Sequence, residues 1–176
     1  MKRQDLKLEE FEIYFKRYLD KLNNETELLQ GFIDGKSATT SFFKSISKDK
    51  LEFRYQPEKW SIKEILQHLI DTERIFMYRC FRIARRDTTA LAGYDQEIYN
   101  HPSKANKKSL ENLLNEFNIN RNNSIALLQS LSDDDLCFTG KASGGKMSAR
   151  AAAFIIIGHD IWHTDVIKNK YLNVRN

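Results

Sequence analysis

Residues 155–172 read IIIGHDIWHTDVIKNKYL, and this stretch does most to decide the fold. It is apolar at its front, yet it places His159 and His163 four residues apart. On a helix with about 100 degrees per residue, both histidines fall in the middle of the apolar stripe. Within about 80 degrees of His159, the same stripe contains Ala152, Ile155, Ile156, Val166 and Ile167. The pattern therefore predicts a buried helix face that carries two imidazoles.

Two histidines at this spacing lie one helical turn apart, so both rings can reach one metal ion at about 2.0 to 2.1 Å. The pair alone is also compatible with a core feature. A third histidine, His68, lies in SIKEILQHLIDTERIF (61–76), at the edge of the apolar stripe of another predicted helix. A lone histidine in that position is more often a satisfied core or boundary residue. Combined with the pair, it would complete a three-histidine site with one open position, which is typical of catalytic metal centres.

Three neutral imidazoles leave the charge of a divalent ion uncompensated. This favours ionisation of a bound water or thiol near neutral pH. Attack by hydroxide and delivery of a thiolate both remain open at this point. The fourth histidine, His101, stands beside Pro102 in a polar stretch and is expected at the surface.

The chain has 176 residues, the size of one ordinary domain, so we expect a single domain over residues 1–176. Only seven glycines and two prolines occur, which favours long helices over many short strands. No window approaches the roughly 18 uninterrupted apolar residues of a membrane span. Acidic residues in MKRQDLKLEEFEIYF, residues 1–15, replace the apolar core that a signal peptide needs. A cytoplasmic protein is expected.

Cysteine content and charge give no support to two further classes. The two cysteines, Cys80 and Cys137, are far apart and form no redox or zinc motif, so a disulfide framework is not expected. A net charge of +4 is too small to indicate a nucleic-acid partner.

The helical pattern predicts an antiparallel bundle of four or five helices. One helix begins at Ser61, which forms a capping-box signature with Glu64, and runs to about Arg86. Others are expected from about Lys107 to Leu131 and from the cap at Ser148 through the histidine stretch.

The remaining segments are less regular. Apolar residues at helical spacing between Phe11 and Leu22 predict an opening helix. A second pattern over 28–46 is interrupted by Gly31 and Gly35. The segment DTTALAGYDQEIYNHPSK, residues 87–104, is an unusually long loop, and SDDDLCFTGKASGGK, residues 132–146, is expected to be a polar turn.

Three motifs carry a family resemblance: KWSIKEILQHLIDTERIFMYRCFRIARRD (59–87), LAGYDQEIY (91–99) and SARAAAFIIIGHDIWHTDVIKNKYL (148–172). Together they resemble the DinB/YfiT-like superfamily of metal-dependent enzymes over most of residues 51–172. The resemblance implies an all-α, DinB-like four-helix bundle with a long connecting loop. It also implies a divalent metal held by one histidine of the second bundle helix and two of the last. By motif these are His68, His159 and His163. Relatives often read GHxxHH in the last helix, and here Trp162 replaces the first histidine of the final pair without disturbing the ligand spacing.

Similar proteins include S-transferases that use bacillithiol or mycothiol, a mycothiol-dependent isomerase and bundles without a known substrate. The resemblance therefore implies a metal-dependent enzyme acting on a small-molecule substrate, with a detoxifying S-transferase that uses a low-molecular-weight thiol slightly ahead of a hydrolase. A non-catalytic, metal-binding stress-response bundle is the alternative from another class. Imidazole ligands suit several metals, of which zinc and nickel are favoured. Apolar helix faces in excess of one core also suggest a homodimer.

Several residues near the predicted site are further candidates. Tyr94 and Asp95 of the long loop would act on substrate as hydrogen-bond donor and proton acceptor. Thr72, one turn beyond His68, would line the pocket. Arg79 shares the edge of its helix with His68 and would attract an anionic substrate or thiol cofactor.

The arginine candidate has an alternative. The cations Arg79, Arg82 and Arg86 are also explained as a solvated helix end. The partners that orient the histidines remain unassigned among Asp71, Glu73 and Asp160.

Overall fold

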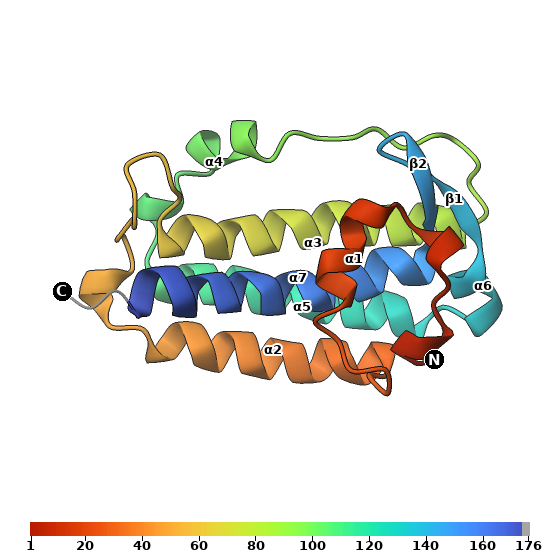
Figure 1. The fold of residues 1–176 in the computed structure, drawn as a ribbon, viewed down its shortest axis with the longest axis horizontal. Coiled ribbons are helices and arrows are strands. Elements are labelled where there is room, and N and C mark those ends of the chain that lie inside the picture. The colour runs from red at the N-terminus through yellow and green to blue at the C-terminus, as the bar shows by residue number, and fades with distance from the viewer. Residues whose placement is uncertain (174–176) are drawn as a thin grey trace.

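The computed structural model of the protein describes residues 1–173, so residues 174–176 of the predicted domain lie outside it. Four long helices form the bundle (Figure 1). They are α2 (Leu28–Ser45), α3 (Ile62–Ala84), α5 (Leu110–Gln129) and α7 (Ala149–Val166). Helix α7 packs against α3 and α2, and α5 packs against the same two helices. The predicted all-α four-helix bundle is confirmed.

The predicted cap of α3 is present. The Ser61 hydroxyl accepts a hydrogen bond from the Glu64 N–H at 3.2 Å, and the Glu64 carboxylate accepts one from the Ser61 N–H at 2.7 Å. The helix ends at Ala84, two residues before the expected Arg86. Arg86 has a φ of 64°, which the regular helix cannot contain.

Helix α7 begins where its cap predicts, because the Ser148 hydroxyl accepts a hydrogen bond from the Ala151 N–H at 3.0 Å. Every residue from Ala149 to Asp160 is buried. A π-helical turn, Ile167–Leu172, continues the helix to the end of the predicted segment.

The apolar pattern over 28–46, which Gly31 and Gly35 interrupt in the sequence, forms one continuous helix, α2. A Cβ atom on Gly31 would lie 2.8 Å from the Ile157 side chain, and one on Gly35 would lie 3.2 Å from Nη1 of Arg121. The two glycines therefore allow close approach of neighbouring helices instead of breaking α2.

The predicted opening helix over Phe11–Leu22 is wrong. Three 3₁₀ turns, Arg3–Asp5, Leu8–Glu10 and Ile13–Phe15, precede the single helical turn α1 (Lys16–Leu19). Tertiary contacts override the helical spacing here. The Glu10 carboxylate binds Ser148 and Arg150, and the Phe11 backbone pairs with Met147.

The polar turn predicted at 132–146 is also wrong, because this segment contains regular structure. It forms α6 (Asp133–Cys137) and an antiparallel hairpin of β1 (Thr139–Ala142) and β2 (Gly145–Ser148), in which Thr139 pairs with Ser148. Ser143 and Gly144 make the tight turn with φ values of 52° and 83°.

The long loop carries the short helix α4 (Glu97–Ser103) and the 3₁₀ turn Ala105–Lys107, both packed on α3. It leaves the hairpin end of the bundle and runs along α3 to the opposite end (Figure 1). A further 3₁₀ turn, Lys48–Lys50, lies between α2 and α3. None of the helices in residues 1–173 has the length and apolar character needed to cross a bilayer.

The apolar core is divided into two clusters. One surrounds the first half of α7 and the second half of α3, and the other surrounds the first halves of α3 and α5. Buried polar residues lie between these clusters along the helices. They are His68, Thr72 and Glu73 of α3, Arg121 of α5, and His159 and Asp160 of α7.

Candidate metal centre

The structure brings the three predicted histidines together. His68 comes from α3, and His159 and His163 come from α7. Each offers one ring nitrogen, and these atoms lie within 4.8 Å of one another. The two Nε2 atoms of His68 and His159 are 3.0 Å apart. Two ligand nitrogens on a tetrahedral ion at about 2.0 to 2.1 Å would be separated by roughly 3.3 Å, so this arrangement fits a metal.

The protonation state of the cluster also fits a metal. Burial lowers the pKa of His68 to about 3, with a further contribution from His163, and it lowers the pKa of His163 itself to about 4. The pKa of His159 lies well below its ordinary value for the same reason. All three rings are therefore neutral near pH 7 and carry free lone pairs. Nδ1 of His163 is buried and has no hydrogen-bond partner within residues 1–173.

Thr72 and Tyr94 form a chain that ends at His68. The Thr72 hydroxyl lies 3.4 Å from Nδ1 of His68, and the Tyr94 hydroxyl donates to Oγ1 of Thr72 at 3.3 Å. A histidine that binds metal through Nε2 carries a proton on Nδ1, and Oγ1 of Thr72 is positioned to accept it. Burial raises the pKa of Tyr94, so its phenol keeps the proton that it donates.

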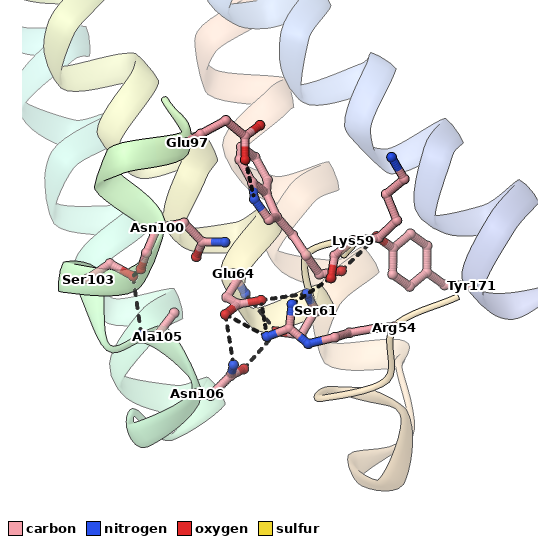
Figure 2. Close-up of polar contacts among 11 residues, drawn as sticks. Arg54, Lys59, Ser61, Glu64, Glu97, Asn100, Ser103, Ala105, Asn106 and Tyr171 are labelled. Carbon is pink, nitrogen blue, oxygen red and sulfur yellow. Dashed lines mark hydrogen bonds and ion pairs between the residues drawn. The ribbon is translucent and has the colours of Figure 1, made fainter. Parts of the chain in front are cut away.

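The Trp60 ring packs against the His68 ring, with 4.7 Å between the ring centroids. Two contacts hold it, with the partners Glu97 and Tyr171 that Figure 2 labels. Its indole N–H donates to Glu97 at 3.2 Å, and its carbonyl accepts a hydrogen bond from the Tyr171 hydroxyl at 2.7 Å. The sequence reasoning missed Trp60, although its position directly before the Ser61 cap places it at the start of the helix that carries His68.

Tyr18 forms a wall next to His159, with 5.1 Å between the ring centroids. Gly158 makes this possible, because a Cβ atom there would lie 2.1 Å from the Tyr18 carbonyl oxygen. Trp162 packs edge-on against the same tyrosine at 5.7 Å, so it is part of the helix packing near the site. The sequence reasoning also missed Tyr18, whose contacts depend on how the N-terminal segment crosses α7.

A pocket of about 600 Å³ opens beside His159. Its lining combines aromatic rings with polar groups of α3 and of the long loop. The aromatic part comprises Tyr14, Phe15, Tyr18, Phe76 and Tyr94, and the polar part includes Thr72, Arg79 and Asp95. The four site residues predicted besides the histidines, Thr72, Arg79, Tyr94 and Asp95, therefore all line this pocket.

These four residues differ in depth. Thr72 and Arg79 are buried, Tyr94 is half-buried, and Asp95 is exposed. The Asp95 carboxylate accepts a hydrogen bond from the Glu97 N–H at 2.9 Å, and this bond turns the chain into α4. His101, as expected, is exposed.

Sequence comparison agrees with the geometry. A sequence profile described as the DinB superfamily matches residues 32–167. The chain belongs to the DinB superfamily. No curated protein matches the chain. Among solved structures, YfiT from Bacillus subtilis, described as a probable metal-dependent hydrolase with an unusual four-helix bundle topology, aligns with a TM-score of 0.72. The two sequences are 15% identical, and the alignment covers 81% of this chain and 82% of YfiT, so the likeness concerns the fold.

The DinB match contains the three histidines but begins after residue 31. The pocket wall made by Tyr14, Phe15 and Tyr18 therefore lies outside the matched region. The pocket lining thus combines residues inside the DinB match with residues outside it.

The DinB profile also covers a second polar cluster, around Arg121. Its guanidinium donates to the two oxygens of Glu73 at 2.9 Å each and to Oδ2 of Asp160 at 2.6 Å. Burial alone would lower the pKa of Arg121, but the charges of Asp160 and Glu73 raise it above its ordinary value. Burial raises the pKa of Asp160 to about 6 despite the arginine. Glu73 and Asp160 thus bind Arg121, while Asp71 binds Gln67 and Arg74 at 3.0 and 3.1 Å.

The remaining cations of the predicted basic edge are not in the pocket. Arg82 pairs with Asp87, and Arg86 approaches Asp135 at 3.4 Å. Of the three, only Arg79 lines the pocket.

Proposed function

We propose that this DinB-superfamily protein is a divalent-metal-dependent enzyme that acts on a small molecule, with His68, His159 and His163 as the metal ligands. The observation that carries the proposal is the convergence of three neutral imidazoles, of which His68 and His159 are buried and His159 lines an open pocket. The cluster offers no carboxylate or thiolate ligand, so a divalent ion would keep its full positive charge. Zinc and nickel are the metals that we favour.

A divalent ion in this site would act as a Lewis acid that lowers the pKa of a bound thiol or water. The surrounding residues have separate tasks. Thr72 orients the His68 ring through Nδ1, and Tyr94 donates a hydrogen bond toward the same hydroxyl. The rings of Trp60 and Tyr18 shield two of the histidines from water. Asp95, exposed at the pocket rim, is the candidate proton acceptor.

For the reaction we propose transfer of a low-molecular-weight thiol, such as bacillithiol, to an electrophile in detoxification. An open pocket of about 600 Å³ has room for a thiol and a second reactant, which supports this choice. Hydrolysis by activated water is the second candidate, because YfiT, which shares the fold, is described as a probable metal-dependent hydrolase.

The test is turnover of monobromobimane with a panel of small thiols by protein loaded with zinc or nickel, run beside hydrolysis of chromogenic esters. We expect thiol conjugation that requires metal and is lost in His163→Ala. The matched control is His101→Ala, which removes an exposed histidine outside the cluster and should retain activity. Metal-dependent ester hydrolysis without conjugation would favour the hydrolase. Metal binding without either reaction would favour a non-catalytic stress-response bundle.

We further propose a cytoplasmic location and a homodimer. The dimer is supported by exposed apolar side chains on the N-terminal segment, where Leu8 and Ile13 are 65% and 74% exposed. Light scattering coupled to gel filtration should give twice the chain mass of 20.7 kDa. A monomer at micromolar concentration would contradict the dimer.

A further inference from the structure

Within residues 1–173, three arginines are almost completely buried, and two of them have carboxylate partners. Arg121, with no exposed surface, lies between Glu73 and Asp160. Arg150, 8% exposed, binds the Glu10 carboxylate. These pairs follow the general rule that a buried charge is compensated by an opposite charge.

Arg79 is the exception. It is only 1% exposed, yet within residues 1–173 no carboxylate lies within salt-bridge distance of it. Its Nη2 donates to two neutral oxygens, the Ala92 carbonyl at 3.0 Å and the Ser143 hydroxyl at 2.7 Å. Burial lowers the pKa of Arg79, but a guanidinium remains charged near neutral pH. The fold therefore retains a desolvated positive charge without a negative partner.

Aromatic rings supply part of the compensation and direct the guanidinium toward the pocket. Its central carbon lies 4.9 Å from the Phe76 ring centroid and 5.6 Å from that of Tyr94. Both rings line the same pocket as Arg79 and His159. Nη2 makes the only two hydrogen bonds of this guanidinium among the described residues, so the N–H groups of Nε and Nη1 are left for a ligand.

From this arrangement we infer that the pocket binds a ligand with one anionic group, a carboxylate or a phosphate, on an apolar body, and that Arg79 binds the anionic group. The inference deepens the proposed function and rests on it for the position of the reacting group, which would lie at the histidines. The aromatic lining suits the apolar body. On α3 the Cα atoms of His68 and Arg79 are about 16 Å apart, and the arginine side chain leans back along the helix toward His68. The anionic group must therefore be several bonds away from the reacting group.

Two acidic residues of the pocket are consistent with this orientation. Glu12 and Asp95 are exposed, and each carboxylate accepts a backbone N–H, from Lys146 at 3.1 Å and from Glu97 at 2.9 Å. Solvent screens them, whereas the buried charge of Arg79 is screened far less. The inner part of the pocket is thus the place for the anionic end of a ligand.

The experiment compares 4-phenylbutanoate with its neutral amide, 4-phenylbutanamide, by isothermal titration calorimetry on the full chain, both metal-free and loaded with zinc. We expect the acid to bind at least about tenfold more tightly than the amide in both forms. In Arg79→Gln the two probes should bind equally. Arg85→Gln, which changes a solvent-exposed arginine at the end of α3, should keep the preference for the acid. A parallel titration with 3-phenylpropylphosphonate distinguishes a phosphate site from a carboxylate site by which of the two acids binds more tightly.

Three results would overturn the inference: equal binding of acid and amide by the wild type, no binding of either probe at millimolar concentration, or a preference that survives in Arg79→Gln. If Arg79 only held the loop and the hairpin together, the wild type would bind the acid and the amide equally. Ser143→Ala would then weaken the binding of both probes alike. Should Arg79→Gln fail to fold, the wild-type ratio and Arg79→Lys, which keeps the charge, still decide. Failure of the proposed function would look different. The wild type would then bind no zinc, while the metal-free protein would still prefer the acid to the amide.

Discussion

The two buried polar regions of this bundle use the same helices in opposite ways. Around Arg121, a cation of α5 meets one carboxylate of α3 and one of α7. Beside the pocket, three neutral imidazoles converge with no carboxylate among them, and the cation of Arg79 has no carboxylate partner within the described chain. The first region is explained by the fold alone, since its charges hold three helices together. The second is not, and its uncompensated groups are those that a metal and an anionic ligand would satisfy.

The sharpest test of this contrast is Arg121→Met beside Arg79→Met. Loss of Arg121 leaves two carboxylates buried without a cation, so the free energy of unfolding should fall by about 3 to 5 kcal/mol. Loss of Arg79 removes an unpaired charge, and only its neutral acceptors lose a donor, so we expect a loss of about 1 to 2 kcal/mol. Urea unfolding at pH 8 measures both values. Equal losses would remove the distinction between the two regions.

Metal should stabilise only through the pocket region. With free zinc about 100-fold above its Kd, the wild type should gain about 2.7 kcal/mol in the free energy of unfolding. His163→Ala should gain nothing, whereas His101→Ala should behave as the wild type. Thermal unfolding with and without zinc gives the comparison, and stabilisation of His163→Ala would place the metal elsewhere.

Glu10 and Arg150 form a further ion pair, which joins the N-terminal segment to α7. Burial alone would raise the pKa of Glu10, but hydrogen bonds from Arg150 and other groups hold it below its ordinary value. The unfolded chain therefore takes up this proton at a higher pH than the folded one. The stabilisation is fully present above about pH 4.5 and is lost as the pH falls through the folded-state pKa. Glu10→Gln should cost about 1.5 kcal/mol at pH 7, and its difference from the wild type should shrink under acid. A difference that does not change between pH 7 and pH 3 would contradict the ion pair.

Thr72→Val should have the smallest effect on unfolding, and it tests whether the pocket region is arranged around a metal. The substitution keeps the shape but removes the oxygen beside Nδ1 of His68. We expect zinc affinity to fall roughly tenfold, as measured by competition with a chelator, while the stability of the metal-free protein changes little. Unchanged zinc affinity would mean that Thr72 is only a packing residue.

The sequence alone predicts the part of the site that depends on helix geometry. His159 and His163 share a face because of their spacing, and the caps at Ser61 and Ser148 fix where α3 and α7 begin. Local rules of this kind do not depend on the rest of the fold, so the pair was found without it, whereas the place of His68 beside the pair was implied by the family resemblance.

Sequence reasoning fails where a contact joins distant segments. It predicted a basic edge of Arg79, Arg82 and Arg86, but only the structure separates the unpaired Arg79 from the two that meet Asp87 and Asp135. The Arg121 cluster joins three helices, and no spacing along one helix reveals it. The N-terminal segment has helical periodicity, yet contacts with the β2 hairpin strand and the close crossing at Gly158 decide its path.

The central claim is that the three histidines bind a metal. The most direct measurement is metal content by inductively coupled plasma mass spectrometry on untagged protein, purified without chelators or nickel resin. We predict about one equivalent of a divalent metal per chain in the wild type and in His101→Ala, and none in His163→Ala. A wild-type protein that is metal-free and cannot be loaded with zinc, nickel, manganese or iron would contradict the account and leave the histidines as a feature of the core.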